Sequence, residues 1–129
     1  MQYILDHHTA VPETDPFTWA AWMEENDLVV ARTDNGVLFV STVFLGINHG
    51  LGRSRPLLFE TMAFFKEDFA QDVAISKVDF SFELGMDRYS TWNEAEKGHY
   101  EMTQRLFSRL DNLRGPVREI TLKYRLDRV

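Results

Sequence analysis

The chain has 129 residues and a formal net charge of −6, and its length suffices for a single domain over residues 1–129. It has no cysteine, which excludes disulfides and thiolate metal sites. Its acidity disfavours nucleic-acid binding, which needs a basic surface, so we expect no nucleic-acid partner. No apolar run is long enough to span a bilayer and the N-terminus lacks a signal-peptide pattern, so we expect a cytoplasmic protein without membrane contact.

The first helix has the clearest start in the N-terminal part of the chain. Residues 2–6 are expected to form a short strand ahead of it. Asp15 is a typical N-cap, and Pro16 suits the first helical position because its missing N–H has no partner there. We therefore predict a helix from Pro16 to about residue 26, with its tryptophans on one apolar side.

Three strands are predicted after this helix. Residues 28–33 and 37–45 are apolar runs joined by Asp-Asn-Gly, a strong tight-turn signal because Asn and Gly tolerate a positive φ. The second run is apolar on both faces of the pleat, which predicts a central strand covered on both sides. Residues 57–65 form the next predicted strand, and the acidic stretch 66–72 is expected to be a loop.

The second helix is the best-marked element of the chain. Thr91 and Glu94 have the spacing of a capping box, and Gly115 followed by proline ends the helical pattern. Residues 77–84 before it alternate cleanly and predict a strand with one face in water, and residues 118–126 after it predict a final strand, at an edge or in a dimer contact. The apolar stripe of this helix is spaced by three or four residues throughout: Trp92, Ala95, His99, Met102, Leu106, Leu110 and Leu113.

The predicted order of elements is therefore β-α-β-β-β-β-α-β. A run of strands joined by short connections, with two helices, predicts an α+β fold. We expect an antiparallel sheet of five to six strands with the two helices packed on it, and part of its second face open to water.

The loop at residues 46–56 is the first candidate site. It carries His49, Arg53 and Arg55 among three glycines, and such a loop resembles an anion cradle in which backbone N–H groups and guanidinium groups meet a phosphate. It is neither a Walker A loop nor a dinucleotide fingerprint, because the glycine spacing differs and a strand follows in place of a helix. The alternative is a flexible hairpin loop with solvated arginines.

Glu60 and His99 are the candidates for acid–base chemistry. Glu60 is the only ionisable residue in its apolar strand, so it needs a partner, a raised pKa or a route to solvent. His99 lies on the apolar stripe of the second helix, and the adjacent Gly98 leaves room for a close approach. The alternatives are a structural ion pair or a strand-edge carboxylate for Glu60, and a core histidine held by one hydrogen bond for His99.

Metal and hydrolase motifs are missing from the sequence. There is no H-E-x-x-H, no histidine pair at helical i,i+4 spacing and no G-x-S-x-G elbow. We therefore predict no metal and no cofactor.

Three segments carry a family resemblance: Ser41 to Gly46 with His49, Pro56 to Phe64, and Tyr89 to His99. Their sequences, STVFLG with the following histidine, PLLFETMAF and YSTWNEAEKGH, resemble those of small hypothetical proteins encoded by bacteriophages and prophages. The resemblance extends over residues 1 to about 105. It implies a phage accessory protein in the cytoplasm of a bacterial host, and the family has no known activity that could be carried over to this chain. Asn48 stands where the family often has Asp.

Two functional hypotheses follow. The first is a non-catalytic binding module, a homo-oligomer such as a homodimer, that contacts a host or phage protein. The second is a small anionic-ligand (nucleotide-like) binding protein or hydrolase, with its site around His49, Arg53, Glu60 and His99. There Glu60 or His99 would act as the base and the arginines would hold the anion. The second hypothesis requires these side chains to converge in one pocket.

Overall fold

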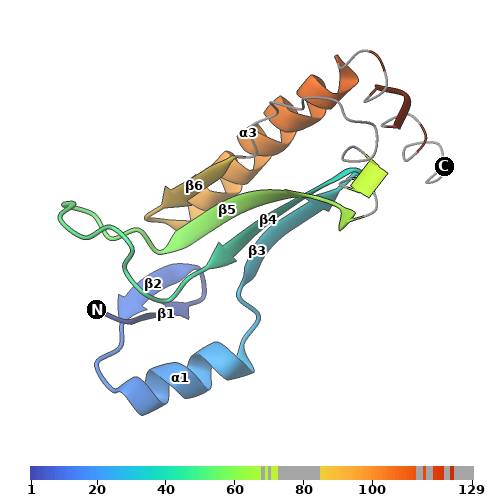
Figure 1. Cartoon of the computed structure of the whole chain (residues 1–129). Coiled ribbons are helices and arrows are strands. Elements are labelled where there is room, and N and C mark those ends of the chain that lie inside the picture. Colours follow the sequence, from blue (N-terminus) through green and yellow to red (C-terminus); the bar gives the residue numbers. More distant parts are fainter. Residues whose placement is uncertain are drawn as a thin grey trace.

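The computed structural model describes residues 1–67, 69, 71–72, 85–112, 115, 118–120 and 123. It has an α+β fold with two antiparallel sheets, which confirms the fold class predicted from the sequence (Figure 1). The elements are, in chain order, β1 (Tyr3–Asp6), β2 (Thr9–Pro12), α1 (Pro16–Glu25), β3 (Val29–Asp34), β4 (Leu38–Phe44), β5 (Phe59–Phe65), β6 (Met86–Tyr89) and α3 (Trp92–Asp111).

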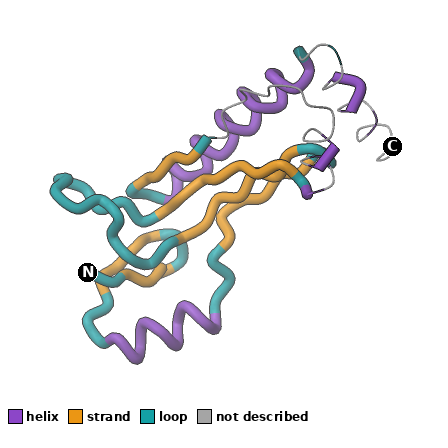
Figure 2. The backbone as a smooth tube through the Cα atoms, viewed as in Figure 1, coloured by secondary structure: helices purple, strands orange, loops and turns teal. Residues whose placement is uncertain are grey.

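The larger sheet has the strand order β3-β4-β5-β6, with every neighbouring pair antiparallel. The long helix α3 lies along one face of it (Figure 2). Thr42 in β4 is directly opposite Ala31 in β3 and Thr61 in β5, so these three residues share the face below α3. The register therefore decides which residues of each strand meet the helix.

The predicted stripe of α3 is the part of the helix that packs on the sheet. Ala95, His99, Met102, Leu106 and Leu110 are buried, as the spacing of three and four residues predicts, whereas Trp92 is half-buried and Leu113 lies outside the described residues. Two clusters form the core. One is built from the sheet and the second half of α3, and contains Val37, Leu38, Val40, Ala63, Phe69, Met102, Leu106 and Leu110. The other lies at the start of α3 and contains Phe44, Leu58, Phe59 and Ala95.

The hairpin β1–β2 and the helix α1 form a separate layer at the end of the sheet where β4 finishes (Figure 1). The Trp19 indole N–H donates to the carbonyl oxygens of Tyr3 and Gly46, at 3.0 and 3.1 Å, and thereby ties α1 to both. Gly46 has a φ of +74°, and a side chain there would meet Met23 at 2.7 Å. The first helix thus packs beside the hairpin, whereas the sequence predicted that it would lie on the main sheet.

Several boundaries differ from the prediction. Strands β2 and β6 were not expected, and each has only four residues, too few for a clear periodic pattern. Residues 67, 69, 71 and 72 are helical instead of loop, because the fully buried Phe69 anchors that segment in the core. The predicted strand at 118–126 is wrong for residues 118–120 and 123, which are helical. The predicted strand at 77–84 lies outside the described residues.

Strand β4 is also less covered than expected. Its residues alternate between buried and half-buried, with Leu38, Val40, Thr42 and Phe44 on the buried side. The apolar character of the other side predicted a second covering layer. In the part of the chain that the structure describes, no helix packs over that side (Figure 2).

Candidate functional site

His99 is a buried histidine whose two ring nitrogens both have partners. Its Nε2 atom lies 2.8 Å from the Thr33 hydroxyl, and its Nδ1 atom lies 2.7 Å from the Thr42 hydroxyl, which in turn lies 2.5 Å from that of Thr61. A neutral imidazole has one donor and one acceptor, and hydroxyl groups satisfy both. Burial lowers the pKa of His99, because desolvation penalises the imidazolium form. These contacts give His99 a structural role between helix and sheet, with two hydrogen bonds where one was expected.

The depressed pKa of His99 predicts that acid destabilises the protein. Below about pH 6.5 the unfolded chain gains a proton at this histidine that the folded chain takes up only at lower pH. The free energy of unfolding should therefore fall as the pH decreases below that value. We expect urea unfolding at pH 7.5 and 5.5 to show a smaller loss of stability in His99→Gln than in the wild type. Equal losses would contradict the prediction.

Glu60 lies on the other face of the sheet from His99. It precedes Thr61, which faces α3, and neighbouring residues of a strand point to opposite faces. The Glu60 carboxylate accepts a hydrogen bond from Nε of Arg88 at 2.9 Å, and the two side chains are 14% and 32% exposed. The structure therefore does not bring Glu60 and His99 into one pocket, and it gives Glu60 the ion pair that was the alternative in the sequence analysis.

The loop at residues 46–56, named here the arginine loop, is closed at its base by Asn48. The amide oxygen of Asn48 accepts from the backbone N–H groups of Gly50 and Leu57, at 2.7 and 3.0 Å. This contact needs an acceptor and no charge, so the neutral amide of Asn48 is sufficient. His49 and Arg53 are exposed on the loop. The loop thus holds its polar side chains outside the core.

Arg55 of the arginine loop reaches the first turn of α3. Its two terminal nitrogens donate to the two carboxylate oxygens of Glu94, at 2.6 and 3.2 Å. The hydrogen bond from Arg55 lowers the pKa of the Glu94 carboxyl, and Thr91 adds to the effect. Thr91 and Glu94 also form the predicted capping box, since the Glu94 N–H donates to the Thr91 hydroxyl. One carboxylate therefore fixes both the helix start and the loop.

An open hollow of about 430 Å³ lies between the arginine loop and β6. Three guanidinium groups line it, those of Arg53, Arg55 and Arg88, together with the Glu94 carboxylate. A second hollow of about 420 Å³ adjoins it at Arg55 and Ser90. Arg88 was not predicted as a site residue, because no local pattern in the sequence links a short strand to a loop some thirty residues earlier.

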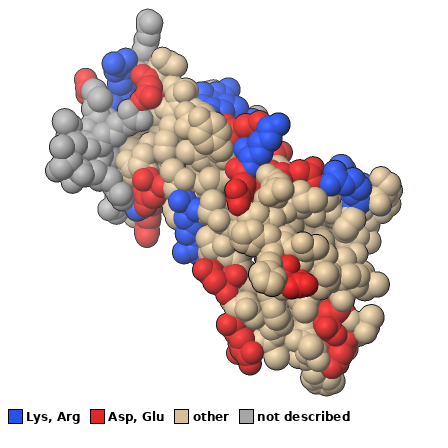
Figure 3. Space-filling view, turned by 180° about the vertical axis from the view of Figure 1, so that it is seen from behind, with Lys and Arg blue, Asp and Glu red and all other residues tan. Residues whose placement is uncertain are grey.

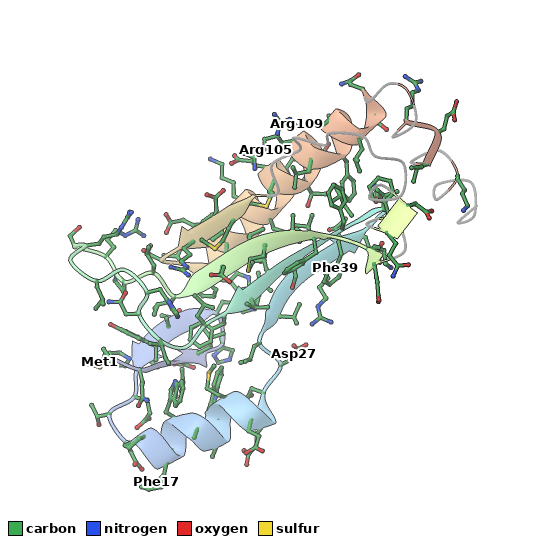
Figure 4. The ribbon with its side chains drawn as sticks, viewed as in Figure 1. Met1, Phe17, Asp27, Phe39, Arg105 and Arg109 are labelled. Carbon is green, nitrogen blue, oxygen red and sulfur yellow. The ribbon has the colours of Figure 1, made fainter. Side chains whose placement is uncertain are left out.

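The face of the larger sheet away from α3 is the second candidate surface. We call it the open face. Phe64 and Met86 on it are 44% and 51% exposed. Phe39 projects on this side, opposite Phe64 in the neighbouring strand (Figure 4). The open face consists of Val29, Arg32, Asp34, Phe39, Ser41, Val43, Glu60, Met62, Phe64, Met86 and Arg88.

Charge is segregated along the chain. Residues 1–31 contain six acidic groups and no lysine or arginine, whereas residues 32–129 contain fourteen acidic and fourteen basic groups. The net charge of −6 thus belongs to the layer made by the hairpin and α1. Acidic groups without basic neighbours mark the lower end of the molecule in Figure 3. The two candidate surfaces lie mainly in the part of the chain whose charges balance.

The described residues contain no group of three or more histidine, aspartate and glutamate side chains arranged to hold a metal ion. Within the same residues, no helix is both long and apolar enough to cross a bilayer. No protein-family model matches the sequence, and neither a curated protein nor a solved structure is detectably similar to the chain. The fold and its two candidate surfaces therefore define the class: an α+β protein with one open sheet face and an arginine-lined hollow.

Proposed function

We propose that the protein is a non-catalytic binding module that contacts a host or phage protein through the open face. The observation that carries the proposal is the set of partly exposed apolar side chains on this face. Phe39, Phe64 and Met86 come from three strands, and the two exposed ones would lose unfavourable contact with water in a complex.

Part of the open face resembles an interface core in its composition. Aromatic residues, methionine and arginine are enriched at such cores, and this face has two of each. The rings of Phe39 and Phe64 stack with centroids 6.5 Å apart, and the Arg32 guanidinium carbon lies 6.0 Å from the Phe39 centroid. These contacts hold flat side chains in place before a partner arrives, which reduces the entropy lost on binding.

The expected setting is the cytoplasm of a bacterial host, as the resemblance to phage proteins implies. The acidic layer of residues 1–31 favours a partner with a basic surface, because opposite potentials speed encounter. Since steering of this kind is screened by salt, the association rate should fall as ionic strength rises. The open face would then supply the short-range contacts.

A pair of phenylalanine substitutions tests this proposal. Phe64→Asp should reduce recovery of the partner from host lysate by about tenfold or more, since a charge replaces a contact residue of the interface. Phe17→Asp is the matched control, because Phe17 is 84% exposed on α1 and lies away from the open face (Figure 4). We expect the control to retain wild-type recovery. Recovery of no protein above background by the wild type, or equal recovery by both variants, would contradict the proposal.

Self-association is proposed for the same face in the absence of the partner, so the dimer and the complex are alternative states of this surface. Two open faces can pack as the two sheets of a sandwich do, with their apolar side chains between them. Sedimentation of the purified protein should then show a dimer that Phe64→Asp converts to monomer and Phe17→Asp leaves intact. A wild-type protein that sediments as a monomer at high micromolar concentration would rule out the dimer.

A further inference from the structure

We propose that the two adjoining hollows beside the arginine loop, one next to β6 and one next to the start of α3, together bind a small phosphomonoester that carries a flat organic group. A nucleoside monophosphate is the ordinary example of this chemical class. The site shares Arg88 with the open face, but its other two arginines come from the arginine loop, and binding there does not require a protein partner.

The cationic half of the site is the hollow lined by Arg53, Arg55 and Arg88. These arginines come from two segments of the chain, the arginine loop and β6, so the fold itself brings them together. Guanidinium groups match phosphate oxygens with two parallel hydrogen bonds. The site therefore has the chemistry that a phosphate requires.

The donors of these arginines are only partly occupied. Each guanidinium has five N–H donors. Arg88 gives Nε to Glu60, and Arg55 gives its terminal nitrogens to Glu94. The side chain of Arg53 has no hydrogen-bond or ion-pair partner among the described residues. The carboxylates of Glu60 and Glu94 pair with the other two arginines, so the positive charge of Arg53 is not compensated.

A dianion suits this arrangement better than a carboxylate. Arg55 already holds the Glu94 carboxylate in a forked contact, so a ligand must offer more charge than a carboxylate to recruit it. A phosphomonoester carries nearly two charges and three acceptor oxygens at neutral pH. The N-terminus of α3, a helix of 20 residues, borders the adjoining second hollow at Thr91, Trp92 and Asn93, and its dipole adds favourable potential for an anion nearby.

The second hollow provides room for the organic group. It adjoins the cationic half at Arg55 and Ser90, and its walls include Tyr3, Pro56 and Trp92. The Trp92 ring is stacked on His8 with centroids 3.8 Å apart and planes 4° apart, and both rings line the hollow, so a ligand there would meet this stacked pair. Each hollow has a volume in the range usual for small-molecule sites, at about 430 and 420 Å³. A flat ring linked to a phosphate has the shape that occupies both halves.

Calorimetric titration of the full chain with three probes tests the proposal. The probes are adenosine 5′-monophosphate, inorganic phosphate and adenosine, each at low ionic strength. We expect the monophosphate to bind about tenfold or more tightly than either of the others, because only it engages both hollows. In a parallel titration followed by NMR, the indole N–H resonance of Trp92 should shift with the monophosphate and not with inorganic phosphate.

Substitutions with opposite expected effects connect the binding to the arginines. Arg53→Gln should weaken binding of the monophosphate about tenfold, the value of a lost charge-assisted hydrogen bond. Glu94→Gln should strengthen it severalfold, because it releases Arg55 and keeps a side chain suited to the capping box. Arg109→Gln, at the far end of α3, is the matched control and should leave the affinity unchanged (Figure 4).

Several outcomes would overturn the proposal. They are no detectable binding of the monophosphate at millimolar concentration, equal affinity for adenosine, and equal affinity for inorganic phosphate. Equal weakening by Arg53→Gln and Arg109→Gln would also overturn it, because it would indicate a general effect of net charge. Melting temperatures of the variants close to the wild-type value establish that each tested chain is folded.

Discussion

Replacement of Leu106 by alanine is expected to lower the free energy of unfolding by about 2–5 kcal/mol. Leu106 has 0% exposure and belongs to the core cluster between α3 and the sheet, together with Val40 and Met102. Truncation removes apolar contacts and leaves a cavity whose walls come from two rigid elements, so the site has little freedom to collapse. Urea unfolding monitored by circular dichroism measures the change.

Gln104→Ala is the control for Leu106→Ala. Gln104 lies on the same helix two residues earlier and is exposed, so its truncation changes helix propensity without removing a core contact. We expect it to change the free energy of unfolding by less than about 0.5 kcal/mol. A loss below about 1 kcal/mol in Leu106→Ala would mean that the core face of α3 is assigned wrongly.

Gly98→Ala is expected to destabilise the protein even though alanine is the better helix former. In an exposed helix interior this substitution would stabilise by about 1 kcal/mol. Here a Cβ atom on Gly98 would overlap the hydroxyl and ring of Tyr89, which packs from β6 against the helix backbone. We expect a net loss of about 1–3 kcal/mol, the usual range for overpacking in a close contact.

A double-mutant cycle separates the clash from other causes. In the Tyr89→Ala background the clash partner is missing, so Gly98→Ala should become neutral or stabilising. Urea unfolding of the four proteins gives the coupling free energy between the two positions. Additive effects would show that Gly98 is required for a reason other than the approach of Tyr89.

The role of Gly98 illustrates what the sequence determines locally. A glycine inside a strongly marked helix indicates that something approaches closely, and the structure confirms an approach by Tyr89. The capping box at Thr91, the turn at Asp34 and the apolar stripe of α3 were predicted for similar reasons. Each of these signals depends on residues within a few positions of one another, whose steric and hydrogen-bonding preferences do not depend on the rest of the chain.

The candidate site was predicted only in part. His49, Arg53 and Arg55 stood out because glycine and arginine in one loop are a local pattern, and Arg53 and Arg55 do line a hollow. Glu60 and His99 were joined to them as two unusual polar residues in apolar segments. The structure accounts for each residue without a shared site. The hydroxyls of Thr33 and Thr42 satisfy the ring nitrogens of the buried His99, and the ion pair with Arg88 satisfies the Glu60 carboxylate.

The sequence by itself determined the α+β class, the long helix with its buried stripe, and the two strands around the Asp-Asn-Gly turn. Only the tertiary structure decided that Arg88 joins the arginine loop and that Glu60 and His99 face opposite sides of the sheet. The register of β5 against β4 and β6 sets these relations, and a shift by one residue would exchange the two faces. Register depends on contacts between distant segments, which no local pattern in the chain encodes.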